Sequence, residues 1–271
     1  MKLIRLLGRA GVLWFRHEAD MYSAALAYFA PFALTPLLLL SITLVGVLIG
    51  TTEVAALLVH WGNTLNPEIT ALLTLSVQNF NALTTQYYLP IVAIIFFCTM
   101  LVVALNCLAS GLHKMWQIEA HGWRNLLNRS LRSVAFVMLL QVYLVCIIIL
   151  NQSIVFISHV PIVDVLALLY PALLFISTLL LFTIGYGLLP IAAPSLRSRF
   201  YGAAVASSLF LFIRIIVTLH TATTPIPHLF GAAGLIIVML VWVYVSAGII
   251  FYGAAFAAVY EEDHLRLRLT K

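Results

Sequence analysis

The stretch GAAGLIIVMLVWVYVSAGIIFYGAAFAAV, residues 231–259, decides the fold of this chain because it contains no charged side chain. An α-helix rises 1.5 Å per residue, so about 20 apolar residues cross a hydrocarbon core about 30 Å thick. The stretch is long enough to span a membrane. Apolar runs of the same kind occur earlier in the chain, at residues 24–50, 87–112, 134–157, 165–189 and 202–219.

The composition agrees with a membrane protein. Of 271 residues, 63% are apolar and only 8% are charged, which excludes an ordinary soluble domain. The runs are continuously apolar, whereas strands of a membrane barrel alternate apolar and polar residues. We predict an all-α polytopic protein in which six transmembrane helices form a single membrane domain over residues 1–271.

The basic residues predict the orientation of these spans. Apart from Arg214, every Lys and Arg lies before span one, between spans two and three, between four and five, or after span six. The segments on the opposite side, residues 51–86, 158–164 and 220–230, contain none. By the positive-inside rule, both termini are expected in the cytoplasm. The thirteen basic residues on this side are Lys2, Arg5, Arg9, Arg16, Lys114, Arg124, Arg129, Arg132, Arg197, Arg199, Arg266, Arg268 and Lys271.

Three segments outside the spans have their own predicted roles. Residues 1–20 form a cytoplasmic interfacial helix, because their cations fall on one stripe of a helix and anchor it to anionic headgroups. Residues 51–86 form an external loop with helical periodicity, and residues 260–271 form a cytoplasmic tail. Since topology explains the positive charge, we expect no nucleic-acid partner.

One cation, Arg214, stands inside an apolar run, FLFIRIIVTLH at residues 210–220. It follows Arg199 by fifteen residues, which corresponds to roughly 22 Å of helix and places it in the outer half of the membrane. An arginine at the centre of a membrane helix costs about 2.5–3.5 kcal/mol to insert. It either faces a water-filled cavity that opens outward, where its donors bind a phosphate or carboxylate, or snorkels to the external headgroups.

Other residues complete this candidate site. Asp164, at the external start of span four, is the best acidic partner for Arg214, and a static pair between the two is a third interpretation. Asn151 and Gln152, near the external end of span three, supply neutral hydrogen bonds. Pro31 and Pro36 leave backbone carbonyls of span one without their helical donors and predict a kink, which is either a packing feature or a site of gating or substrate contact.

Further polar residues within the spans are interpreted as hydrogen bonds between helices, which is the commonest use of such side chains in membranes. They are Asn106, Ser110, Gln141, Thr178 and Tyr186.

Two stretches, ALAYFAPFALTPLLLL (residues 25–40) and FGAAGLIIVMLVWVYVSAGIIFYGAAFAAVYE (residues 230–261), resemble the YihY/virulence factor BrkB family, formerly called ribonuclease BN-like. The first is similar to the family's alanine-tyrosine and proline-containing helix, and the second to its last helix. The resemblance implies a bacterial inner-membrane protein linked to envelope integrity or virulence, and transport of amphiphiles or lipids is proposed for some members. Many members have glutamate where this chain has Ala255 and tyrosine where it has Phe230, so roles of those groups are not transferred.

We therefore expect a transporter or flippase of an anionic amphiphile, with membrane lipids as partners. The alternative is a non-transporting scaffold of the envelope. A nuclease is not expected, because the cytoplasmic side offers only the EEDH run at residues 261–264 and the pair Glu119 and His121. The chain is accordingly expected to be no enzyme and to need no cofactor or metal. Protein partners and oligomeric state stay open.

Overall fold

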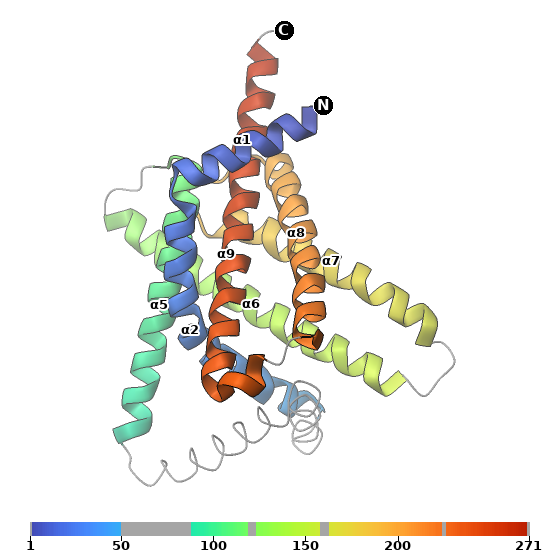
Figure 1. Cartoon of the computed structure of the whole chain (residues 1–271). Coiled ribbons are helices and arrows are strands. Elements are labelled where there is room, and N and C mark those ends of the chain that lie inside the picture. Colours follow the sequence, from blue (N-terminus) through green and yellow to red (C-terminus); the bar gives the residue numbers. More distant parts are fainter. Residues whose placement is uncertain (1, 50–87, 119–122, 158–162, 224–225, 270–271) are drawn as a thin grey trace.

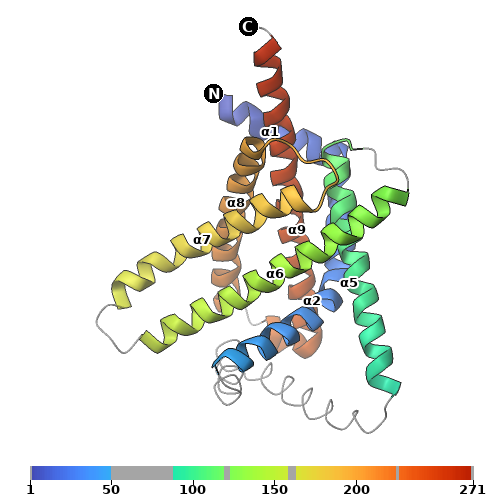
Figure 2. The same cartoon turned by 180° about the vertical axis from the view of Figure 1, so that it is seen from behind.

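The helices of the chain gather at one end of the molecule and spread apart toward the other (Figures 1 and 2). The computed structural model describes residues 2–49, 88–118, 123–157, 163–223 and 226–269. These residues form seven helices and no strand, in agreement with the predicted all-α fold. The helices are α1 (Lys2–Arg16), α2 (Ala19–Ile49), α5 (Tyr88–Met115), α6 (Trp123–Ile157), α7 (Val163–Leu188), α8 (Leu196–Thr223) and α9 (Ile226–Leu269).

Each predicted apolar run falls on its own helix. Among the described residues, four segments are long and apolar enough to cross a membrane: 95–115, 171–188, 196–216 and 239–265. In α6 the corresponding apolar segment, Leu131–Ile147, is shorter. The number of six spans therefore stays a prediction. The external loop predicted at residues 51–86 lies outside the described residues.

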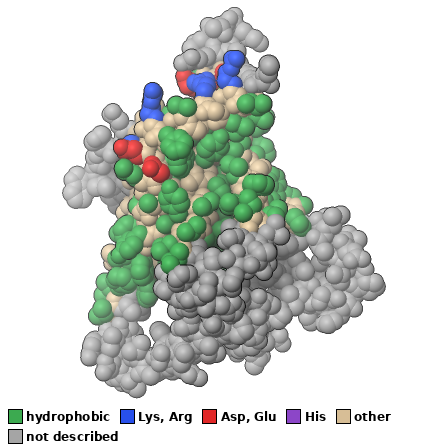
Figure 3. Space-filling model, in the orientation of Figure 1, with side chains coloured by type: hydrophobic (Ala, Val, Ile, Leu, Met, Phe, Trp, Pro, Cys, Tyr) green, Lys and Arg blue, Asp and Glu red, His purple; other side chains and the backbone are tan. Residues whose placement is uncertain are grey.

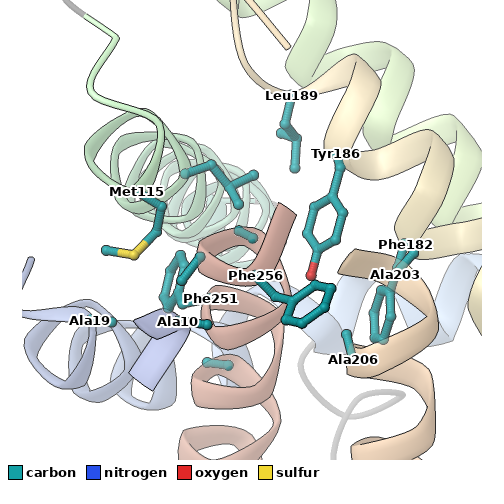
Figure 4. Packing of buried hydrophobic residues seen from close by; sticks show 14 of the residues in the cluster. Ala10, Ala19, Met115, Phe182, Tyr186, Leu189, Ala203, Ala206, Phe251 and Phe256 are labelled. Atoms are coloured by element: carbon teal, nitrogen blue, oxygen red, sulfur yellow. The ribbon is translucent and has the colours of Figure 1, made fainter. Parts of the chain in front are cut away.

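α9 is the central helix of the gathered end, where α1, α2, α5 and α8 all pack against it. Its aromatic side chains fill the spaces between these neighbours: Phe251 and Phe256 are almost completely buried (Figure 4). Around them the core consists largely of alanine, which lets helix backbones come close together. The fully buried alanines are Ala10, Ala19, Ala109, Ala203, Ala206, Ala254, Ala255 and Ala257.

α8 and α9 approach each other most closely where two glycines face one another. A Cβ atom on Gly202 would lie 2.5 Å from the carbonyl oxygen of Gly253. A Cβ atom on Gly253 would lie 2.7 Å from the carbonyl oxygen of Gly202. The two backbones are thus in contact without any side chain between them, an arrangement that membrane helices reach only with small residues.

Hydrogen bonds between helices join the remaining parts of the bundle. The buried Tyr186 of α7 donates to the carbonyl oxygen of Ile250 in α9 at 2.6 Å. Thr178 of α7 lies 3.3 Å from the Tyr143 hydroxyl of α6. The prediction that Thr178 and Tyr186 bond neighbouring helices is therefore confirmed.

Sharp corners at the gathered end are made by two residues in the left-handed region. Glu18, with φ 55°, joins α1 to α2, and Gln117, with φ 53°, ends α5. At the second corner the N–H of Ile118 donates to the carbonyl oxygen of His113 at 2.9 Å, which is the hydrogen bond of a helix C-terminal cap. These corners bring α1 and the end of α5 to the same side of α9.

Candidate functional site

An open groove of about 950 Å³ lies where α1 crosses α9. Its walls come from α1, the end of α5, residues 192–194 before α8, and the last turns of α9. Both ends of the described chain lie at this end of the molecule (Figure 1), and Lys and Arg side chains gather there (Figure 3). The groove therefore belongs to the basic side on which the sequence placed both termini.

One face of α1 supplies the positive charge of the groove. Arg5, Arg9, Val12 and Arg16 follow each other at intervals of four, three and four residues and all line it. This spacing keeps them within one narrow stripe of the helix. The stripe of cations predicted at the membrane surface thus forms one wall of a groove in the fold.

Two hydrogen bonds fix α1 against α9. The Trp14 indole N–H donates to the carbonyl oxygen of Gly248 at 3.1 Å. In the opposite direction, the Tyr252 hydroxyl of α9 donates to the carbonyl oxygen of Leu7 at 3.0 Å. Because each bond joins an aromatic side chain of one helix to the backbone of the other, the position of α1 is set along its length.

The opposite wall of the groove carries two carboxylates with different tasks. Glu262 pairs with the Arg9 guanidinium at 2.8 Å across the groove. Glu261 instead accepts from the backbone N–H of Ser195 at 2.8 Å and from its hydroxyl at 3.0 Å, at the start of α8. The negative charge of Glu261 thus serves a helix N-terminus, where carboxylates are favoured.

The segment between α7 and α8 is held by side chains from other helices. The backbone N–H of Ile191 donates to Nε2 of the buried His113 at 3.1 Å, so this ring nitrogen carries no proton in the bond. The Arg132 guanidinium donates to the carbonyl oxygen of Pro190. These contacts place residues 192–194 at the edge of the groove.

Near the groove, an exposed ion pair joins the α1–α2 corner to α5. The Lys114 ammonium lies 2.7 Å from a Glu18 carboxylate oxygen. Its hydrogen bond and positive charge lower the pKa of the Glu18 carboxyl below its ordinary value. The same ammonium lies 5.8 Å from the centre of the Tyr22 ring.

Arg214 lies on the side of α8 that faces the rest of the bundle. It is half-buried and shares its helix face with the buried Ala203 and Ser207 and with Phe210, at intervals of four, three and four residues. Phe210 contacts aromatic rings of both α7 and α9. The outward face at the same level consists of the exposed Phe212, Ile215 and Ile216. Whether Arg214 faces a water-filled cavity or snorkels to the external headgroups stays a prediction.

The proposed companions of Arg214 are described only at the backbone. Asn151 and Gln152 lie in α6 and Asp164 lies in the first turn of α7, but their side chains fall outside the described part of the structure. Their meeting with Arg214 stays a prediction.

The two prolines predicted to kink span one both lie inside α2. The helix continues from Ala19 to Ile49 through half-buried Pro31 and through Pro36. Its second half takes a different direction from its first (Figures 1 and 2). A role of this bend in gating stays a prediction.

Sequence reasoning did not predict the groove. It placed the α1 arginines on one stripe but assigned them to headgroup anchoring, and it assigned residues 260–271 to a cytoplasmic tail. The available signal was the spacing of Ala258, Glu261, Glu262 and Leu265, which puts these groove residues on one face of α9. That two such faces meet depends on the corner at Glu18, which no spacing in the sequence indicates.

Comparison with known proteins identifies the family. The family described as Virulence factor BrkB matches residues 14–270, which is nearly the whole chain. No curated protein and no solved structure matches the chain. The chain therefore belongs to the Virulence factor BrkB family, and with its long apolar helices it is a multi-pass integral membrane protein.

Proposed function

We propose that this member of the Virulence factor BrkB family moves an anionic amphiphile, such as a lipid, across the inner membrane of the bacterial envelope. The observation that best supports the proposal is the position of Arg214, a half-buried cation on the bundle-facing side of an apolar helix. An arginine held among helices costs free energy to insert, and such residues commonly mark the path of a substrate.

The chemistry of the side chain fits a phosphate or carboxylate headgroup. The planar guanidinium presents a fork of donors that matches the two oxygens of such an anion, while acyl chains are accommodated by the surrounding lipid. In this proposal Arg214 receives the headgroup in a cavity that opens outward. Asp164 is its partner between transport events, and Asn151 and Gln152 add neutral hydrogen bonds.

The bend of α2 supplies the movement. Helices that contain proline have unpaired carbonyls and change direction at low cost. We assign to Pro31 and Pro36 the hinge that opens and closes access to Arg214. The proposal includes no covalent chemistry, cofactor or metal.

The test is transport by the purified chain in proteoliposomes. A fluorescent anionic lipid in one leaflet is followed as it becomes accessible to a reductant on the other side. A hydrogen bond to a charged group is worth about 1.5–3 kcal/mol, so Arg214→Ala is expected to lower the rate about tenfold or more. Phe212→Ala, on the exposed face of the same helix, is the matched control and should keep the wild-type rate.

A second variant separates charge from geometry. Arg214→Lys keeps the charge but loses the fork of donors and is expected to retain part of the rate. An unchanged rate in Arg214→Ala that unfolds at the wild-type temperature would refute the role of this residue. Absence of transport by the wild-type protein, with a defined protein partner captured by cross-linking, would instead favour the scaffold alternative.

A further inference from the structure

The groove between α1 and α9 is lined by more positive than negative side chains. Arg5, Arg9 and Arg16 line it, and Arg9 pairs with Glu262. Arg5 and Arg16 form no ion pair with any residue that the structure describes. The other carboxylate of the groove, Glu261, accepts hydrogen bonds from Ser195 and keeps its negative charge, so the three arginines of the groove exceed its two carboxylates by one charge. Two arginines at opposite ends of the stripe therefore remain available to an anion.

The same groove is lined with apolar groups. Val12 lies between the arginines on α1, Trp116 comes from the end of α5, and Leu265 comes from α9. The indole N–H of Trp116 is used by the carbonyl oxygen of Ala254 at 2.8 Å. A ligand that fills this space must combine an anionic group with an apolar part.

The rest of α1 places the groove at a membrane surface. Ile4 and Phe15, on the flank beside the arginine stripe, are 74% and 73% exposed. A helix with apolar residues exposed beside cations lies in the interface, with its apolar face among the acyl chains. The groove thus opens at the depth where lipid phosphates are found.

We propose that this groove is a binding site for the phosphate group of an anionic lipid from the leaflet on the basic side of the membrane. Arg5 and Arg16 lie about 16 Å apart along α1, so the phosphate is bound by one guanidinium at a time, whose donors match phosphate oxygens. The lipid's apolar part contacts Val12, Trp116 and Leu265. Glu262 opposes binding, because its carboxylate neutralises Arg9 and repels the phosphate.

This inference goes beyond transport through the bundle, because Arg214 does not line the groove. Lipid binding at α1 and passage past Arg214 are separate events with separate tests. Arg214→Ala should leave binding in the groove unchanged even if it abolishes transport.

The test measures lipid binding by the full chain in detergent, with native mass spectrometry counting bound phosphatidylglycerol and phosphatidylcholine. An arginine near a membrane surface contributes about a fivefold factor in affinity for anionic lipid, so the double variant Arg5→Gln/Arg16→Gln should bind phosphatidylglycerol about 25-fold more weakly. The variant keeps Arg9 and its pair with Glu262. Arg197→Gln, an exposed arginine outside the groove, is the matched control and should bind like the wild type.

A gain of affinity provides the second arm. Glu262→Gln is expected to bind phosphatidylglycerol about fivefold more tightly, since removing one negative charge has the effect of adding one positive charge. If the double variant does not fold, this variant decides: tighter binding supports the site, and unchanged or weaker binding overturns it. Wild-type affinity in a folded double variant overturns it as well.

Competition with inorganic phosphate shows whether the groove binds a lipid headgroup or free phosphate. At millimolar concentration it should not displace phosphatidylglycerol, because it lacks the apolar part that the groove contacts. Displacement, or equal binding of phosphatidylcholine, would overturn the assignment to an anionic lipid.

Discussion

Glu18 shows how one residue at the basic end joins backbone geometry to charge. Its positive φ of 55° closes the corner between α1 and α2, and its carboxylate lies 2.7 Å from the Lys114 ammonium of α5. A left-handed conformation is uncommon outside glycine, so the ion pair forms at a residue whose backbone is already constrained. The corner sets the direction in which α1 crosses α9.

The ion pair predicts a pH dependence of stability. Lys114 lowers the pKa of the Glu18 carboxyl in the folded protein. A carboxyl of this kind stabilises the fold above its unfolded pKa, and the contribution disappears as pH falls through the lower folded value. Glu18→Gln should therefore unfold at a slightly lower temperature than the wild type at pH 7. The gap should start to narrow as the pH falls below about 4, the ordinary range of a glutamate, and should close only below the lowered pKa of the folded protein.

Thermal unfolding of the two proteins in detergent, from pH 7 to pH 3, measures this gap. Both partners are exposed, so the gap is small and salt reduces it further. A gap of constant size across the whole range would show that Glu18 acts through the corner alone and not through its charge.

At the residue scale, the sequence showed which side chains are chemically unusual, but it did not show which residues they contact. Arg214 was identified from its charge within an apolar run, and its place on the inner face of α8 follows from its spacing to Phe210 and Ser207. The pairing of Arg9 with Glu262 was not predicted, because the two residues are 253 positions apart in the chain. Contacts of this kind depend on where whole helices lie.

At the element scale, the helices follow the apolar runs but extend beyond them. α6 begins at Trp123 and α8 at Leu196, before the predicted spans at 134 and 202, and α9 continues past 259 to Leu269. Hydropathy changes where lipid gives way to water, whereas helical hydrogen bonds continue wherever the backbone permits them. The predicted cytoplasmic tail at residues 260–271 therefore begins as the last turns of α9, and these turns carry Glu261 and Glu262.

The packing of α8 on α9 leads to a prediction about single methyl groups. A Cβ atom at Gly253 would lie 2.5 Å from the Tyr186 hydroxyl oxygen and 2.7 Å from the Ala206 Cβ atom. Because a backbone carbonyl lies equally close, the helices have to separate to accept it. Gly253→Ala is expected to lower the free energy of unfolding by about 1–3 kcal/mol, as overpacked cores generally do.

Gly8 is the matched control for this change. It is also helical and a Cβ atom there would meet nothing within 4 Å, so Gly8→Ala should raise stability by about 0.5–1 kcal/mol through the lower backbone entropy of alanine. Denaturant unfolding in detergent compares the two variants. Equal effects of both substitutions would contradict the close approach of α8 and α9.

At the scale of the whole molecule, the sequence predicted the kind of fold but not the arrangement. Periodicity and hydropathy show which segments are helical and apolar, and they are similar for all six runs. The central place of α9 comes instead from small residues that let it approach its neighbours. Which of these small residues meet depends on the packing of all the helices together. The groove could not be predicted for the same reason, since it forms only where α1, α5 and α9 come together.

The orientation of the molecule in the membrane can be tested directly. Both ends of the described chain lie at one end of the bundle (Figure 1), and the positive-inside rule places that end in the cytoplasm. A fusion of alkaline phosphatase to the C-terminus should be inactive in cells, because the enzyme needs an oxidising compartment for its disulfides. The same enzyme inserted between residues 51 and 86 should be active. The reverse pattern would place the groove on the outer face.

The backbone contact between Gly202 and Gly253 also limits which motions the protein can make. Helices slide past one another when flexible side chains between them can change rotamer, and at this contact no side chain separates the two backbones. We therefore expect α8 and α9 to move together as one unit, which carries Arg214 with it. In the proposed transport, access to Arg214 then changes where this unit meets α2, α5 and the pair α6 and α7. Cross-links across those boundaries are expected to stop transport, whereas a cross-link between α8 and α9 should not.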